Sequence, residues 1–487
     1  MDIFNQIREA PFLPSINTGT LLDLATGNFV PGVNESHILN GGIGLTNATV
    51  GRPQMFKSTL MIGAAMNAYA RCPGARMIIY DTEKTLLAAR LLAMADVPIP
   101  ETNMFKLTTR GEYYPEEIFD LVRGIAEEKM KHRKDYIVEI PHIDPKTGKA
   151  QRMFIPTFAG YDSWSNMEPR VVEEMMLSVL KTGDDGVVSA KTSITSSDTN
   201  TSFMRDGLAK KKMIRELNAL AEKAGIYLFF TAHIGDKIEM NPYAPTPKSL
   251  QYMKMSDKPK GVGSDFLFLM MNLLDCRSAK ILNNDSDKET LYPTKEWRTS
   301  PSDLNEVAQV IARCKGNVSG TQIKSVVSQT EGLLSALTNY HLLKEDKYWG
   351  LDGNQQRHSP TLMPNNQMTR TTVNEKLRSE PRLARAVEIL SQLNFIQNNW
   401  TVRGAPVDFT MSPQVLAEKL MSSGYAMDDI LDSRGWWTYD YNGVSHPQTY
   451  LSLWDILSIV KGTYKPTIKA ARVPVEKATP IKAKVAA

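Results

Sequence analysis

Gly51-Arg52-Pro53-Gln54-Met55-Phe56-Lys57-Ser58-Thr59 is the stretch of this 487-residue chain that decides the fold. It follows a short apolar run at residues 48–50 and precedes an apolar pattern with helical spacing. A loop between a strand and a helix can wrap its backbone N–H groups around a phosphate, while a Lys meets the β and γ oxygens and a Ser hydroxyl meets Mg²⁺. The general pattern has Gly directly before the Lys, where this chain has Phe56. We therefore predict a phosphate loop whose Phe56 side chain points away from the phosphate.

The sequence around this loop alternates short apolar runs with longer amphipathic stretches. That alternation predicts an α/β core with a mostly parallel sheet flanked by helices. We expect strands at residues 48–50, 77–80, 154–161, 226–231, 266–274 and 323–328. We expect helices at residues 58–70, 85–95, 115–131 and 205–224, and a hairpin at 136–158.

Composition and length limit the class of protein. Hydrophobic residues make up 42% and charged residues 23%, which is typical of a soluble globular chain. The three cysteines, Cys72, Cys276 and Cys314, are too far apart for a disulfide framework or a zinc cluster, so a reducing cytoplasm is expected. The N-terminus lacks a signal-peptide pattern, and no apolar run is long enough to cross a bilayer.

Shifts in composition divide the chain into four predicted parts. Residues 1–38 are expected to form a short N-terminal arm for oligomerisation, and residues 39–340 the α/β core. Residues 341–460 are expected to form a small, mostly helical domain, and residues 461–487 a disordered basic tail. Such a tail either holds nucleic acid through phosphate contacts or only aids solubility, and the sequence favours neither.

Two acidic groups follow apolar runs. Residues 76–80 lead into Asp81 and Glu83, and ligands collect at the carboxyl ends of parallel strands, so Glu83 is a candidate to polarise an attacking water. The alternative is that both acids cap the next helix. Asp162 closes the run at 154–161 and is a candidate Mg²⁺ ligand together with Ser58. Pro156 and Gly160 are unusual inside a central strand, so a plain turn aspartate is the alternative.

His233 closes the apolar run at 226–232 and is a candidate sensor of the γ-phosphate, although a lone His is more often structural. Two long polar stretches, 181–204 and 234–264, are expected to leave the same edge of the sheet, and loops this long are usually functional or mobile. The resemblance given below implies that both contact DNA. The candidate phosphate contacts are Arg205, Lys210, Lys237, Lys254, Lys258 and Lys260, and the candidate base-stacking groups are Phe203 and Tyr252. For each Lys the alternative is a solvated surface charge.

Taken together, these motifs resemble the bacteriophage UvsX-type recombinases, relatives of RecA whose phosphate loop carries Phe-Lys-Ser. The resemblance spans about residues 38–338 and is carried, in the family's order, by residues 51–58, 80–83, 156–163, 202–212, 232–233, and the pair 311–317 and 326–332. It implies a RecA-like core that binds ATP and Mg²⁺, with Lys57, Glu83 and His233 in catalytic roles. It also implies that Arg313 and Lys315 reach the ATP of a neighbouring subunit.

The same resemblance implies a DNA-dependent ATPase. The expected protein forms a helical filament on single-stranded DNA and pairs it with a homologous duplex, in phage recombination, repair and replication. Its expected partners are single-stranded and double-stranded DNA, further copies of itself, and single-strand-binding and loading proteins. The expected location is the cytoplasm of the bacterial host, without a membrane partner.

Two other functions fit part of the pattern. A hexameric replicative DNA helicase would use the same core and ATP site, but the sequence predicts no large N-terminal assembly domain. A non-catalytic DNA-binding or assembly protein with a relict nucleotide fold would account for Phe56 and for the interrupted strand before Asp162.

Overall fold

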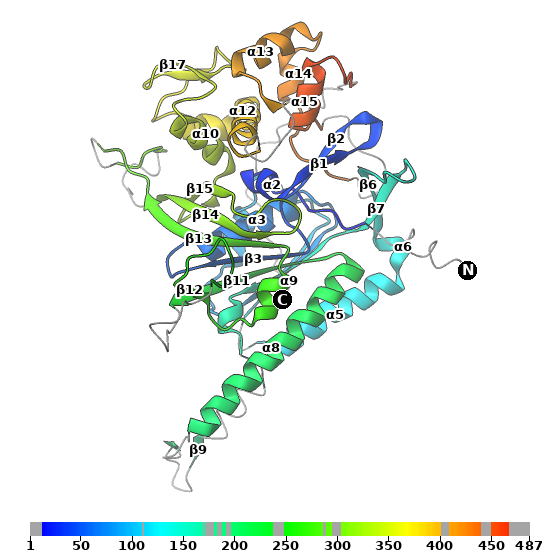
Figure 1. Ribbon diagram of the computed structural model, residues 1–487, viewed down its shortest axis with the longest axis vertical. Helices are drawn as coiled ribbons and strands as arrows, with labels where there is room; N and C mark the ends of the chain where they lie inside the picture. The colour runs from blue at the N-terminus through cyan, green and yellow to red at the C-terminus, as the bar shows by residue number, and fades with distance from the viewer. Residues whose placement is uncertain are drawn as a thin grey trace.

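The computed structural model describes residues 12–466, except residues 110–111, 169, 171–179, 183–187, 191–195, 237–247, 286–288, 295–302, 401–408 and 440–449. Within these residues, ten strands form one sheet with helices on both faces, and a C-terminal helical region lies beside it (Figure 1). The expectation of an α/β protein with a largely parallel central sheet is confirmed. No helix in the described ranges is long and apolar enough to span a membrane.

The centre of the sheet is parallel. In spatial order its parallel strands are β13 (Asn272–Ile281), β3 (Thr46–Gly51), β11 (Ile226–Asp236), β8 (Thr157–Asp162), β4 (Arg76–Asp81) and β5 (Met104–Thr109). Beyond β13 the sheet continues antiparallel through β14 (Leu304–Cys314), β15 (Gln322–Ser328) and β16 (Gly332–Leu333). A short strand, β12 (Asp257–Pro259), pairs with the end of β11.

Both faces of the central strands are buried, which explains their continuous apolar sequences. Along β11, Tyr227 and Phe229 join the cluster on the face covered by α3 (Lys57–Ala70). Leu228 and Phe230 join the opposite cluster, which α5 (Pro115–Lys131), α8 (Ser196–Ala224) and α9 (Ser264–Leu269) cover. The side chains alternate between the two faces because successive residues of a strand point to opposite sides.

The remaining described elements surround this sheet. Near the N-terminus they are α2 (Leu21–Thr26), β1 (Asn28–Pro31) and β2 (His37–Asn40), and within the core they are α4 (Ala88–Ala93), α6 (Arg133–Tyr136), the hairpin β6 (Ile137–Ile143) and β7 (Ala150–Phe154), β9 (Leu180–Thr182) and β10 (Val188–Ala190). After the core come α10 (Ser335–Glu345), β17 (Leu351–Gly353), β18 (His358–Pro360), α11 (Val373–Ser379), α12 (Pro381–Asn399), α13 (Pro413–Ser422), α14 (Met427–Leu431) and α15 (Leu453–Val460).

The described part of the N-terminal segment, residues 12–40, packs on the rest of the chain. Phe29 stacks on Phe409 with ring centres 5.8 Å apart and meets Trp454 at 5.7 Å. The first 11 residues of the expected arm lie outside the described residues, as do residues 467–487 of the expected tail.

Two of the expected strands are divided in the structure. The run at 266–274 forms α9 and then β13, so the prediction of a single strand there is wrong. Phe266 and Met270, four residues apart, are both buried, which is the helical period; an apolar run by itself does not reveal its period. The run at 154–161 is divided at Pro156, which lies between β7 and β8 and therefore interrupts neither strand.

Gly160 lies inside β8 because of close packing. A Cβ at this position would stand 2.1 Å from the ring of Phe229 on the neighbouring β11. We expect Gly160→Ala to destabilise the protein by about 1–3 kcal/mol, because the buried ring must move to admit the methyl group.

The matched control is Gly124→Ala in α5, where a Cβ would meet nothing within 4 Å. This control should be neutral or should stabilise the helix by up to about 1 kcal/mol. Urea or thermal unfolding midpoints of both variants check the prediction, and equal midpoints for the two would contradict it.

Candidate nucleotide-binding site

The candidate phosphate loop, residues 51–59, joins β3 to α3. Gln54 and Phe56 have φ of 62° and 54°, and no side chain caps the first turn of α3. Its N–H groups are therefore available to an anion, which the helix dipole also favours. The left-handed conformation at Phe56 is the physical reason why other phosphate loops use Gly there.

The Phe56 side chain packs against a small apolar cluster formed by residues of α3, β13, β14, β15 and β16, namely Leu60, Cys276, Val307, Val327 and Leu333. This packing offsets part of the cost of a left-handed conformation at a residue with a side chain.

Lys57 and Arg52 hold the loop in shape. Lys57 is 7% exposed, and its Nζ donates to the carbonyl oxygen of Arg52 at 3.0 Å. Burial lowers the pKa of Lys57, and the nearby Cys276 and Asp162 oppose this shift. Arg52 pairs with Asp236 at 2.5 Å and with Asp257 at 3.1 Å, so the loop is tied to the segment that follows β11.

Asp162 is brought to this loop from β8. It is 5% exposed, and its Oδ1 accepts hydrogen bonds from Ser58 Oγ at 2.9 Å and from Thr231 Oγ1. Burial raises the pKa of Asp162, while these two hydrogen bonds lower it. The hydroxyl of Ser58 and the carboxylate of Asp162 are oxygen donors of the kind that Mg²⁺ prefers, so the donor set fits that ion.

The two acids after β4 have different environments. Asp81 is fully buried and accepts hydrogen bonds from three backbone N–H groups of the following turn, those of Glu83, Lys84 and Leu86. Glu83 caps nothing. Its Oε1 lies 3.2 Å from His233 Nε2 and accepts a hydrogen bond from Asn166 Nδ2 at 2.9 Å. The capping alternative therefore accounts for Asp81 and leaves Glu83 available for chemistry.

His233 stands beside the phosphate loop, because it pairs in register with Gly51 across β11 and β3. Thr231 and Asn166 were not found by sequence reasoning. Thr231 lies inside an apolar strand, and Asn166 follows Asp162 in a 3-10 turn, η2 (Trp164–Asn166), whose sequence carries no known spacing rule. Only the strand order reveals that both side chains face this edge of the sheet.

Arg313 and Lys315 lie at the opposite edge of the sheet. The backbone N–H of Lys315 donates to Met271, whose own N–H donates to Thr46, the first residue of β3. Their side chains turn toward α9: Arg313 lies 5.8 Å from the ring centre of Phe268, and Lys315 Nζ donates to the carbonyl of Leu269. The structure does not bring either residue to the phosphate loop of its own chain.

The candidate DNA-contacting residues differ in exposure. Lys254, Lys258 and Lys260 are exposed, and Tyr252 is 44% exposed. Lys210 is only 5% exposed on α8, so its burial does not favour a phosphate contact. The side chains of Phe203 and Arg205, and the whole of Lys237, lie outside the described residues.

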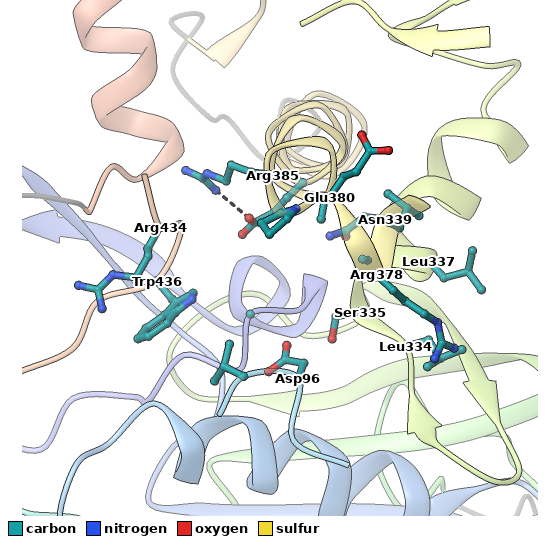
Figure 2. A pocket seen from close by; sticks show the side chains of 18 of the residues that line it. Asp96, Leu334, Ser335, Leu337, Asn339, Arg378, Glu380, Arg385, Arg434 and Trp436 are labelled. Carbon is teal, nitrogen blue, oxygen red and sulfur yellow. Dashed lines mark ion pairs between the residues drawn. The ribbon is translucent and has the colours of Figure 1, made fainter. Parts of the chain in front are cut away.

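A cleft of about 1430 Å³ lies between the core and the C-terminal helical region, and Asp96, Arg385 and Trp436 are among the residues that line it (Figure 2). Its arginines are largely paired with acids: Arg71 lies 2.6 Å from Asp96, and Arg385 lies 2.9 Å from Glu388. None of the residues that line it belongs to the stretch at 51–59.

One further group of potential metal ligands occurs among the described residues. Glu306, His341 and Glu345 place ligand atoms within 4.8 Å of one another. Lys324 already pairs with Glu306 at 3.2 Å, and His341 lies 2.9 Å from the same carboxylate, so two cations or donors already occupy Glu306.

Comparisons with known proteins add no relative. No protein-family model matches the chain, and no curated protein matches it. The site is therefore interpreted from its own geometry.

The strain at Phe56 gives a stability prediction. Phe56→Ala and Phe56→Gly lose the same packing, but only Gly relieves the left-handed conformation. We expect Phe56→Gly to be more stable than Phe56→Ala by about 1–2 kcal/mol. Unfolding midpoints measure the difference. An Ala variant as stable as the Gly variant would show that the loop is not held in the left-handed region.

Proposed function

We propose that this chain is an ATP-dependent DNA recombinase of the RecA-like class, which forms filaments on single-stranded DNA and pairs it with a homologous duplex. One observation carries the proposal. The phosphate loop after β3, Asp162 after β8, Glu83 after β4 and His233 on β11 meet at one edge of a parallel sheet. These groups come from four separate strands, and together they supply the parts that ATP hydrolysis needs.

Each group has a distinct role in the proposed reaction. Lys57 and the N–H groups of the first turn of α3 bind the phosphates. Ser58 and Asp162 would hold Mg²⁺, which neutralises charge on the phosphate oxygens when it is bound. Glu83 takes the proton from the attacking water, and His233, which contacts Glu83, senses the γ-phosphate.

The positions of Arg313 and Lys315 support an assembly of several copies. Because both lie at the edge opposite the phosphate loop, they can serve ATP only when another copy docks there. An interface that joins two different edges is head-to-tail, and it generates rings or helical filaments.

The exposed lysines after β11 support a nucleic-acid partner. Lys254, Lys258 and Lys260 stand in the segment that Arg52 ties to the phosphate loop through Asp257. Contacts of these lysines with DNA phosphates would therefore lie next to the ATP site. Because Pro156 lies outside β8, it does not interrupt the strand that ends in Asp162, which supports the recombinase over the relict-fold alternative.

The first test is ATP hydrolysis with and without single-stranded DNA. We expect turnover that DNA stimulates, and a loss of about 100-fold or more in Lys57→Ala, because the phosphates lose their buried cation. Lys131→Ala, at the exposed end of α5, is the control and should keep wild-type turnover. Turnover unchanged by Lys57→Ala would reject the site; DNA-stimulated turnover without strand exchange would reject the recombinase.

The second test asks whether two copies share one site. Lys57→Ala and the double variant Arg313→Ala/Lys315→Ala should each be inactive alone. Mixed in equal amounts, they should regain activity at about a quarter of the junctions, where an intact loop meets intact basic residues. Absence of any recovery would place all catalytic groups within one chain. Electron microscopy of the active protein with ATP and DNA should show open filaments, and closed hexameric rings would favour the helicase.

A further inference from the structure

Three hydrogen bonds form a closed ring that joins β11, η2 and the segment that carries the exposed lysines. The backbone N–H of His233 donates to Ser165 Oγ at 2.9 Å. Ser165 Oγ in turn donates to the carbonyl of Lys260 at 2.8 Å. The N–H of Lys260 closes the ring by donating to the carbonyl of His233 at 2.7 Å.

The backbone after Lys260 also rests directly on η2. Gly261 has φ +63°, and a Cβ there would stand 2.8 Å from the carbonyl oxygen of Ser165. This close approach leaves no room between the two segments. A shift of Lys260 and Gly261 toward η2 must therefore move Ser165, because packed interiors transmit displacement.

The other side of η2 holds the candidate catalytic carboxylate. Asn166 Nδ2 donates to Glu83 Oε1 at 2.9 Å and lies 3.5 Å from His233 Nε2. The turn itself is anchored by Trp164, which is 1% exposed and packs edge-on against Phe230 with ring centres 5.0 Å apart. Ser165 and Asn166 are adjacent residues of this anchored turn, so their positions are coupled.

The bond from Asn166 restrains the orientation of Glu83. Asn166 Nδ2, His233 Nε2 and Ser163 Oγ all meet the same oxygen, Oε1, at 2.9, 3.2 and 3.5 Å, so together they hold the carboxylate in one orientation. A Glu83 that activates water must direct a carboxylate oxygen at that water, and the bond to Asn166 opposes any turn of the carboxylate toward it.

We propose that Ser165 and Asn166 are positioning residues through which single-stranded DNA on the Lys258–Lys260 segment controls Glu83. This inference rests on the proposed function. Without DNA, Asn166 holds Glu83 Oε1 and turnover is slow. DNA phosphates that bind Lys258 and Lys260 shift the backbone of this segment, and the shift passes through Ser165 to Asn166 and releases Glu83. The coupling requires DNA to bind the released arrangement more tightly.

The first variant is Asn166→Ala. It should raise kcat without DNA about ten-fold, because Glu83 loses one hydrogen bond to its charged carboxylate. The KM for ATP and the kcat with DNA should change little. The ratio of stimulated to basal turnover should fall accordingly. A residue that only shapes the fold would lower both rates together.

The second variant is Ser165→Ala, which opens the ring while leaving Asn166 in place. It should lower the DNA stimulation ratio about five-fold or more, with an unchanged Kd for single-stranded DNA by fluorescence anisotropy. Ser249→Ala is the matched control. It removes a similar bond in the same segment, from Ser249 Oγ to the carbonyl of Asp257 at 3.0 Å, but it does not touch η2. Its stimulation ratio should equal that of the wild type.

Several results would overturn the coupling. They are an Asn166→Ala variant with both rates lowered equally, one with both rates unchanged, and a Ser165→Ala variant that loses DNA binding or keeps full stimulation. In each of these cases, ATP turnover by the wild-type protein that is lost in Lys57→Ala would still support the proposed function. A wild-type protein without such turnover would reject both proposals together.

Discussion

The buried carboxylate of Asp162 is the contact on which the rest of the site depends. A charge that is 5% exposed is costly unless donors surround it. Its Oδ1 accepts hydrogen bonds from Ser58 at the start of α3 and from Thr231 on β11. One carboxylate thus joins three elements that are distant in sequence. Because these bonds form only in one register of the strands, they align the phosphate loop, β11 and β8.

The sheet also separates two sets of groups. Its parallel strands bring Lys57, Glu83 and His233 to one edge, whereas antiparallel β14 returns Arg313 to the other edge. A monomer with this arrangement has an incomplete ATP site in the proposed function. In the proposed function, the ATP site needs a second copy of the chain because antiparallel β14 places Arg313 at the edge opposite Lys57.

Phe56 illustrates how a departure from a general pattern is accommodated. The backbone before Lys57 is left-handed, a conformation that Gly adopts at the lowest cost. Here the cost of a side chain is offset by the packing of the ring on Leu60, Cys276 and Leu333. The N–H groups of the first turn of α3 thus stay uncapped although the residue before Lys57 carries a side chain.

The sequence by itself determined the features that depend on neighbours along the chain. The helix predicted at 115–131 has those bounds in the structure, where Pro115 opens it and Glu117 Oε2 accepts a hydrogen bond from the N–H of Tyr114. The tertiary structure alone decided that Ser58 meets Asp162, that Asn166 meets Glu83, and that residues 266–274 divide between α9 and β13. A local motif is set by dihedral angles within a few residues, whereas these contacts depend on strand order and on packing from both faces of the sheet, which no short window of sequence contains.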